Sequence, residues 1–329
     1  MDSESPIDSL AELPTVALEG RSTGDLIFKG ALTTAAIAIP ILLVFLVYEL
    51  WHGSRLAIER YGFDFITGST WDPVAEVFGA FPLIVGTLVS SALALLLAVP
   101  LSLAVAIYLT EFAPQSIRRP ISFLIELLAA IPSVVYGLWG IFFLIPFLRE
   151  TVFPALQSLL GFLPFFQGVI YGQSMLAAAI ILAIMVMPYI MSVSREVLEA
   201  VPASQREAAL GLGATRWEAV WTAIVPYARS GIIGAVILGL GRALGETMAV
   251  TMLIGNRHEI AASLFAPGYT MAAVIANEFA EAVTDIHLSA LTYVALTLFV
   301  VTVLVNAVAR LLIWRVNQGS GALKGGGGR

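Results

Sequence analysis

Six long apolar stretches constrain the fold of this chain more than any other feature. A helix needs about 20 apolar residues to cross the roughly 30 Å hydrocarbon core of a bilayer. Stretches of this kind, each bounded by charges, proline or glycine, lie near residues 30–50, 83–109, 121–148, 174–193, 230–254 and 289–314. The sequence therefore predicts an all-α polytopic membrane protein with about six transmembrane helices.

The composition agrees with a membrane protein and excludes several kinds of site. Of the 329 residues, 59% are hydrophobic and 12% are charged, whereas about 25% of a soluble domain is charged. The sequence has no cysteine, which excludes disulfides and thiol catalysis. His52, His258 and His287 are scattered and lack the spacing of metal ligands, so we expect loop residues and no metal site. A net charge of −6 without a basic patch argues against a nucleic-acid partner.

The two ends of the chain differ from its apolar middle. Residues 1–28 carry five acidic residues before position 20 and lack the positive start of a signal peptide. We expect a disordered cytoplasmic leader there, followed by a first transmembrane helix and an outer loop in 29–82. The core domain is expected in 83–315, and the glycine-rich residues 316–329 predict a flexible tail.

Two shorter segments are expected outside the six spans. Residues 152–166 are apolar but contain Pro154, Gly161 and Pro164, which favours an interfacial or re-entrant element. Residues 270–283 have the pattern of a short amphipathic helix in the last outer loop.

The distribution of Lys and Arg predicts the orientation of the spans. With the N-terminus inside, the inner segments hold eleven of these residues and the outer loops hold four. Because cytoplasmic loops carry the excess of positive charge, both termini are expected in the cytoplasm, as in a multi-pass protein of the cytoplasmic membrane.

The longest inner loop, residues 194–229, has a different composition from the spans around it. Its sequence predicts a short helix after Pro202, a turn at Gly211 and Gly213, and a second helix that Pro226 breaks. Such a pair of helices could dock into a groove of another protein or rest on lipid headgroups.

Five residues of this loop resemble the EAA motif of ABC-importer permeases. The matching positions are Glu207, Ala208, Ala209, Gly213 and Pro226. Ala223 and Val225 stand where the motif has Ile and Leu, and both are still apolar. The resemblance implies that this loop couples the membrane protein to a cytoplasmic ATPase subunit.

A charged pair interrupts the fifth apolar stretch in the sequence GLGRALGETMAV, residues 239–250. Arg242 lies at the midpoint of the predicted span, where an arginine costs roughly 2.5–3.5 kcal/mol on the insertion scale. Glu246 is expected on the same helical face one turn away. The pair is either a structural ion pair or part of an oxyanion pathway, in which Arg242 donates forked hydrogen bonds and Glu246 orients it.

Three stretches resemble the PstC-type permeases of phosphate importers: GLGRALGETMAV, ELLAAIPSVVYGLWG at 126–140 and IGN at 254–256. The resemblance covers roughly residues 28–315 and implies that Arg242 and Glu246 line the path of phosphate. Ser133 and Tyr136, next to Pro132, either line the same path or pack around a proline kink.

The same resemblance implies the partners of the chain. They are a sister permease that forms a heterodimer, a dimer of ATPase subunits, an extracytoplasmic phosphate-binding protein and membrane lipid. The sequence has no GxxxxGK[ST] loop. ATP and Mg²⁺ are therefore expected on the partner ATPase subunits, and this chain is expected to bind no cofactor and to be a transport subunit, not an enzyme.

Three alternatives stay open on the residues alone. The chain could be a self-sufficient carrier in which Glu246 or Glu126 takes up a proton and Arg242 binds the anion. It could serve an ABC importer for another oxyanion, such as sulfate or molybdate. It could also be a membrane receptor or scaffold.

Overall fold

The computed structural model describes the backbone of residues 23–321 and the side chains of residues 24–311. Most of the predicted acidic leader and the end of the predicted glycine-rich tail lie outside the described residues. The described part contains six helices that are long and apolar enough to cross a membrane, which confirms the predicted fold class. The chain divides into two units, one ending at Glu49 and the other starting at Leu50.

The first unit is built on α1 (Thr23–Gly53), which contains the predicted first span. Between Gly30 and Leu50 its only charged residue is Glu49. A helix that is apolar on all sides suits a lipid surrounding.

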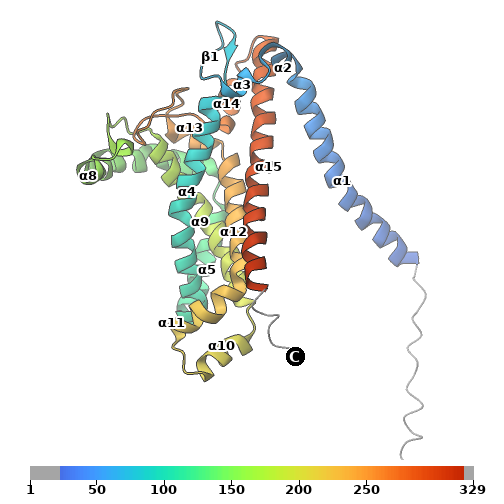
Figure 1. Cartoon of the computed structure of the whole chain (residues 1–329), viewed down its shortest axis with the longest axis vertical. Coiled ribbons are helices and arrows are strands. Elements are labelled where there is room, and N and C mark those ends of the chain that lie inside the picture. Colours follow the sequence, from blue (N-terminus) through green and yellow to red (C-terminus); the bar gives the residue numbers. More distant parts are fainter. Residues whose placement is uncertain (1–22, 322–329) are drawn as a thin grey trace, which may run out of the picture. The chain divides into compact units, whose positions relative to one another are not determined.

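The second unit is a helical bundle centred on α4 (Phe81–Ile107) and α9 (Met175–Glu199). Buried alanines such as Ala94 and Ala178 lie where these helices meet. Small residues let helix backbones approach closely in a membrane. α12 (Val225–Gly245) packs against both helices, and α15 (Asp285–Gly321) runs beside α12 (Figure 1).

The third predicted span is wrong in its boundaries. Residues 115–130 form a separate amphipathic helix, α5 (Gln115–Ala130), and the apolar helix begins at Ser133. Pro132 ends α5 because it lacks a backbone N–H and disfavours a helical conformation at Ile131, whose ψ is 129°.

The apolar helix after this break extends from Ser133 to Leu160. It contains two π-helical turns; its parts are α6 (Ser133–Trp139), η3 (Gly140–Leu144), α7 (Ile145–Phe147), η4 (Leu148–Val152) and α8 (Phe153–Leu160). The prediction of a separate element at 152–166 is therefore wrong up to Leu160. Pro154 does not interrupt the helix, because it sits in the first turn of α8 directly after a π-helical turn. Only the residues after Leu160 leave the helix; they include the short turn η5 (Pro164–Phe166). α8 lies at the side of the bundle in Figure 1.

The fifth predicted span is also shifted. One continuous helix runs from Arg216 to Gly245. It comprises α11 (Arg216–Ala219), η6 (Val220–Ile224) and α12. The predicted break at Pro226 is absent because this proline lies in the first turn of α12, where the preceding π-helical turn accommodates it. The chain breaks instead after Gly245 and resumes as α13 (Met248–Ile254).

Short elements cover the two ends of the bundle. At one end lie α2 (Arg55–Tyr61), α3 (Asp64–Thr67), a hairpin of β1 (Trp71–Asp72) and β2 (Val77–Phe78), and α14 (Met271–Glu278). They share an apolar cluster with α15 that includes Phe65, Phe78 and Leu291, and α14 confirms the helix predicted near 270–283. α10 (Ala203–Gly211) and η2 (Tyr108–Phe112), the π-helical end of α4, lie at the opposite end (Figure 1).

Candidate functional site

Arg242 and Glu246 are placed differently from the sequence prediction. Arg242 lies in the last turn of α12, and the backbone of Glu246 is already extended, with φ −69° and ψ 129°. The helix ends at Gly245, so the two side chains do not share a helical face. Within the described part of the chain no ion pair joins them. The geometry therefore gives no support to a structural Arg242–Glu246 ion pair.

The partner of Arg242 is an aromatic ring. The guanidinium carbon lies 4.2 Å from the ring centroid of Tyr189 on α9. The Nε atom of Arg242 is buried and has no hydrogen-bond partner among the described residues. A cation over an aromatic face is stabilised by about 0.5–2 kcal/mol. Among the described residues, Arg242 is thus held by a ring and by no carboxylate.

Two tyrosine hydroxyls meet the end of α5 beside this arginine. The Tyr189 hydroxyl donates to the carbonyl of Ala129 at 2.8 Å, and the Tyr136 hydroxyl donates to the carbonyl of Leu128 at 2.9 Å. Carbonyls in the last turn of a helix lack partners within the helix. Tyr136 and the ring that holds Arg242 therefore bind neighbouring carbonyls at the end of α5, which places this predicted residue close to the arginine's ring. Ser133 begins α6 at the same break and is partly buried.

The two helices that follow the breaks pack against each other. A Cβ atom on Gly137 of α6 would lie 2.4 Å from the sulfur of Met252 and 3.3 Å from the Cα of Ala249, both on α13. A Cβ on Gly140 would lie 2.7 Å from a methyl group of Leu253. The α5–α6 and α12–α13 breaks are therefore joined by a close glycine contact. Interrupted helices at membrane depth supply backbone groups for binding substrate or ions.

The residues of the EAA-like pattern lie on α10 and the turn after it. Glu207 and Ala208 are exposed, Ala209 is partly buried, and Pro226 lies further on in α12. Gly213 has a φ of +90°, a conformation that favours glycine, and its N–H donates to the carbonyl of Leu210.

The next helix starts at a capping box. The side chain of Thr215 accepts from the N–H of Glu218, whose carboxylate accepts from the N–H of Thr215. The structure thus confirms the predicted helix–turn–helix in this loop.

The surface of this helix–turn–helix exposes large apolar side chains. Leu212 is 90% exposed, Trp217 58% and Trp221 49%. The two tryptophan rings contact each other edge to face, with centroids 5.5 Å apart. Large apolar side chains that are exposed in this way, with two of them in contact, are typical of a protein or membrane contact.

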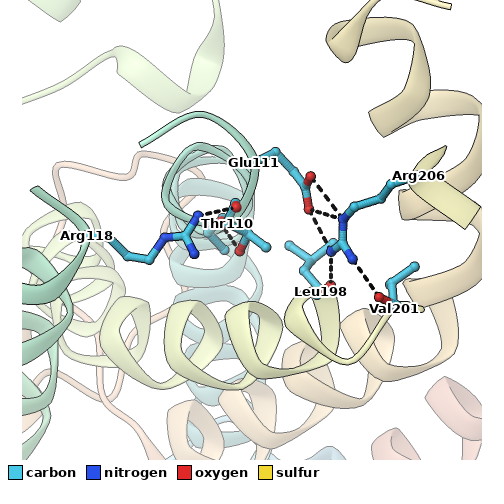
Figure 2. Close-up of polar contacts among 7 residues, drawn as sticks. Thr110, Glu111, Arg118, Leu198, Val201 and Arg206 are labelled. Atoms are coloured by element: carbon cyan, nitrogen blue, oxygen red, sulfur yellow. Dashed lines mark hydrogen bonds and ion pairs between the residues drawn. The ribbon is translucent and has the colours of Figure 1, made fainter. Parts of the chain in front are cut away.

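Arg206 anchors α10 to the rest of the bundle, and sequence reasoning did not identify it. Its Nη2 atom lies 2.9 Å from Oε1 of Glu111 in η2, and its Nε atom lies 3.2 Å from both carboxylate oxygens. The same guanidinium donates to the carbonyls of Leu198 and Val201 (Figure 2). The available signal was Glu111 itself, because it is the only acidic residue between Glu76 and Glu126.

At the other end of the bundle, two of the scattered histidines converge on Glu278. His287 Nε2 lies 3.2 Å from one carboxylate oxygen and His258 Nε2 lies 3.5 Å from the other. Trp71 Nε1 donates to the same carboxylate at 2.9 Å. Burial acts to raise the pKa of Glu278, but its hydrogen bonds and the nearby His258 outweigh burial and lower that pKa. Within the described residues no group of three or more such ligands is placed to hold a metal ion.

Glu126, the other proposed proton acceptor, forms its ion pair with Arg195 and not with Arg242. Its carboxylate is 3.5 Å from Nη2 of Arg195 on α9, and its side chain is 59% exposed. This position offers no buried proton site next to the arginine.

Comparison with known proteins identifies the family. The model of the binding-protein-dependent transport system inner membrane component family matches residues 98–318. The chain belongs to this family. Together with the six apolar helices, this membership indicates a multi-pass protein of the inner membrane.

Full-length relatives support the narrower resemblance seen in the sequence. A phosphate transport system permease protein PstC of Mesorhizobium japonicum is 48% identical over 302 residues, which cover 91% of this chain and 92% of the relative. Its counterpart in Haemophilus influenzae is 46% identical over 299 residues, which cover 90% and 95%. The predicted resemblance to PstC-type permeases is confirmed.

Solved structures agree on the fold. A chain of a bacterial alginate ABC transporter, in complex with an alginate-bound periplasmic protein, has 18% sequence identity and a TM-score of 0.60. The match covers 90% of this chain and 98% of the transporter chain. At this identity the likeness supports the ABC importer permease fold and nothing more.

Proposed function

We propose that this chain is the transmembrane permease subunit of an ATP-driven importer that moves inorganic phosphate across the cytoplasmic membrane. Relatives named as phosphate permeases are 44–48% identical over most of the chain. The observation that carries the proposal is Arg242, which lies in the last turn of α12 with an aromatic partner and, among the described residues, no carboxylate partner. A guanidinium held in this way presents N–H donors to an oxyanion.

The anion path runs past Arg242 and the residues around the two breaks. Arg242 binds the phosphate oxygens, and Ser133 and Tyr136 line the path at the start of α6. Glu246 lies just beyond α12 and repels the anion. A lone arginine in a low-dielectric site would hold phosphate tightly, so a nearby carboxylate favours release.

The contact that couples ATP hydrolysis to transport lies at α10 and the turn after it. The surface that docks into an ATPase subunit consists of Glu207, Ala208, Ala209 and Gly213. Pro226 lies in the helix that leads from this surface into the membrane. ATP and Mg²⁺ bind to the dimer of partner ATPase subunits, so this chain is not an enzyme by itself. The exposed Leu212 and Trp217 supply apolar contact area for the docking.

The remaining partners follow from this arrangement. A sister permease completes the membrane part as a heterodimer, and a phosphate-binding protein delivers the anion from outside. The end with α10 faces the cytoplasm together with both termini, as the excess of Lys and Arg in those segments favours.

Reconstituted transport tests the proposal. The chain is assembled with its sister permease, ATPase subunits and binding protein in liposomes, and uptake of ³²P-phosphate is measured. We expect ATP-dependent uptake that an inactive ATPase subunit abolishes and that Arg242→Ala reduces by at least about a hundredfold, since hydrogen bonds to a charged group contribute roughly 1.5–3 kcal/mol each. Arg257→Ala is the matched control, because Arg257 also lies over a tyrosine ring, that of Tyr171, but is exposed.

Three outcomes would contradict the proposal. Uptake that persists without ATP hydrolysis and follows a pH gradient would indicate a proton-coupled carrier. Uptake of sulfate or molybdate in preference to phosphate would indicate an importer for another oxyanion. Normal transport by Arg242→Ala would remove Arg242 from the anion path.

A further inference from the structure

We infer that Tyr189 is the positioning residue of the anion site: its ring holds the face of the Arg242 guanidinium and leaves the N–H edge free for the oxyanion. This inference rests on the proposed function of Arg242. It assigns to α9 a part in substrate binding that the sequence pattern did not indicate.

The first step concerns how an arginine charge is stabilised inside a bundle. The guanidinium is planar, with five N–H donors directed outward in its plane and two faces without donors. A carboxylate partner binds the edge and takes two donors. Tyr189 places its ring centroid 4.2 Å from the guanidinium carbon, a distance that suits stacking on a guanidinium face instead of its edge.

The second step concerns the donors that remain. Arg242 makes no ion pair with a described residue, and its buried Nε lacks a hydrogen-bond partner in the described part of the chain. An unpaired buried donor is costly, so a site that retains one is suited to a ligand that completes it. A tetrahedral oxyanion such as phosphate has acceptors for Nε and a neighbouring Nη together.

The third step concerns the rigidity of the ring. Tyr189 lies on α9, which packs against both α4 and α12. Its hydroxyl is fixed by the 2.8 Å hydrogen bond to Ala129 at the end of α5. The ring is therefore held at both ends, and the guanidinium that stacks on it is held at the α5–α6 break. A pre-ordered cation loses less conformational entropy when the anion arrives.

The test measures phosphate binding at Arg242 without relying on transport. The membrane complex of both permease subunits and the ATPase subunits is treated with phenylglyoxal, which modifies accessible arginines, and modification of Arg242 is quantified by mass spectrometry. The phosphate concentration that protects half of Arg242 is the readout. Tyr189→Leu removes the ring, and we expect this concentration to rise about 2- to 30-fold.

Two variants separate the ring from other effects. Tyr189→Phe keeps the ring and removes only its hydrogen bond to Ala129, so we expect a clearly smaller rise than in Tyr189→Leu, because the cation–ring contact remains. Tyr171→Leu removes the exposed ring beside Arg257 and is expected to leave Arg242 protection unchanged. An equal loss of protection in Tyr189→Phe and Tyr189→Leu would overturn the inference, as would unchanged protection in Tyr189→Leu.

The failure of the inference and the failure of the proposed function give different results. If phosphate does not protect Arg242 in the unaltered complex, Arg242 is not an anion site, and the proposed path and this inference both fail. If phosphate protects Arg242 equally well with and without the Tyr189 ring, the path stands and only the positioning role is wrong.

Discussion

Arg206 and Glu111 join α10 to the end of α4 through a two-point ion pair. The guanidinium Nη2 lies 2.9 Å from Oε1, and Nε lies 3.2 Å from both oxygens of the carboxylate. Further N–H groups of the same guanidinium donate to the carbonyls of Leu198 and Val201 near the end of α9. Figure 2 shows the arginine between these groups. A displacement of α10 must therefore move the ends of α4 and α9, or break these contacts.

Arg206→Ala is expected to uncouple ATP hydrolysis from transport. Without the guanidinium, α10 moves with the ATPase subunits while α4 and α9 stay behind. We expect phosphate uptake per ATP to fall by about tenfold or more, because each hydrogen bond to a charged group contributes roughly 1.5–3 kcal/mol. Uptake and ATP hydrolysis are measured together in liposomes. Glu111→Gln should give the same direction of change.

Arg60→Ala is the control for this prediction. It removes another close ion pair, Arg60–Glu76 at 2.8 Å, which lies at the opposite end of the bundle. Its ratio of uptake to hydrolysis should stay normal. An unchanged ratio in Arg206→Ala would show that this anchor plays no part in coupling.

Gly213→Ala is expected to weaken binding of the ATPase subunit. The φ of +90° at Gly213 strains any residue with a Cβ by about 1–2 kcal/mol, so the turn after α10 would change shape. We expect the affinity for the ATPase subunit to fall about tenfold, as measured by titration of the purified components. Gly211→Ala is the control, because Gly211 ends α10 without a positive φ and a Cβ there would meet nothing within 4 Å. A larger loss in Gly211→Ala than in Gly213→Ala would contradict the assignment.

Glu278 is expected to make the stability of the protein depend on acid pH. Its pKa in the folded protein is lowered, so Glu278 stabilises the fold above the pKa of the unfolded chain, near 4.3. This contribution is lost as the pH falls below about 4.3 through the lowered pKa. Thermal unfolding in detergent should therefore show a midpoint that drops in this range.

Glu278→Gln should lower the unfolding midpoint at neutral pH and reduce its dependence on acid pH. The amide lacks the negative charge that the carboxylate places beside His258 and His287, although it still accepts a hydrogen bond from Trp71. Glu259→Gln, an exposed carboxylate in the same loop as His258, is the control and should change neither quantity. An acid dependence that survives unchanged in Glu278→Gln would assign it to other groups.

Gly86→Ala is expected to destabilise the contact between α4 and the loop before α14. A Cβ on Gly86 would lie 2.0 Å from the backbone oxygen of Tyr269, which has little freedom to move away. We expect a loss of about 1–3 kcal/mol in stability, the range typical of overpacking, and a lower unfolding midpoint. Gly234→Ala on α12 is the control, since a Cβ there meets nothing within 4 Å. Equal midpoints for the two variants would contradict the close contact.

Local features of the sequence predicted the helices well but not their ends. Pro132 ends a helix, because no relieving turn precedes it and Ile131 becomes extended. Pro226 does not, because a π-helical turn directly before it absorbs the missing N–H. The two prolines look alike in the sequence. The difference lies in the backbone before each proline, which is extended at Ile131 and π-helical before Pro226 and which the residue pattern does not show.

Contacts between residues that are far apart in the sequence were not predicted either. The spacing of four residues between Arg242 and Glu246 predicted a contact within one helix. In the structure the arginine lies over the ring of Tyr189, which is 53 positions earlier. His258 and His287 showed no relation in the sequence, and the fold brings both within 3.5 Å of the Glu278 carboxylate. Each of these contacts depends on which faces of different helices meet.

The sequence by itself determined the membrane class, the six apolar helices and the EAA-like loop. These follow from length, hydrophobicity and short motifs, which act locally along the chain. Only the tertiary structure decided where α5 and α12 break, which ring holds Arg242 and how Arg206 anchors α10. These features depend on the packing of helices that are far apart in the sequence. A buried charge or carbonyl has no water to bind, so it can pair only with the groups that the fold places beside it.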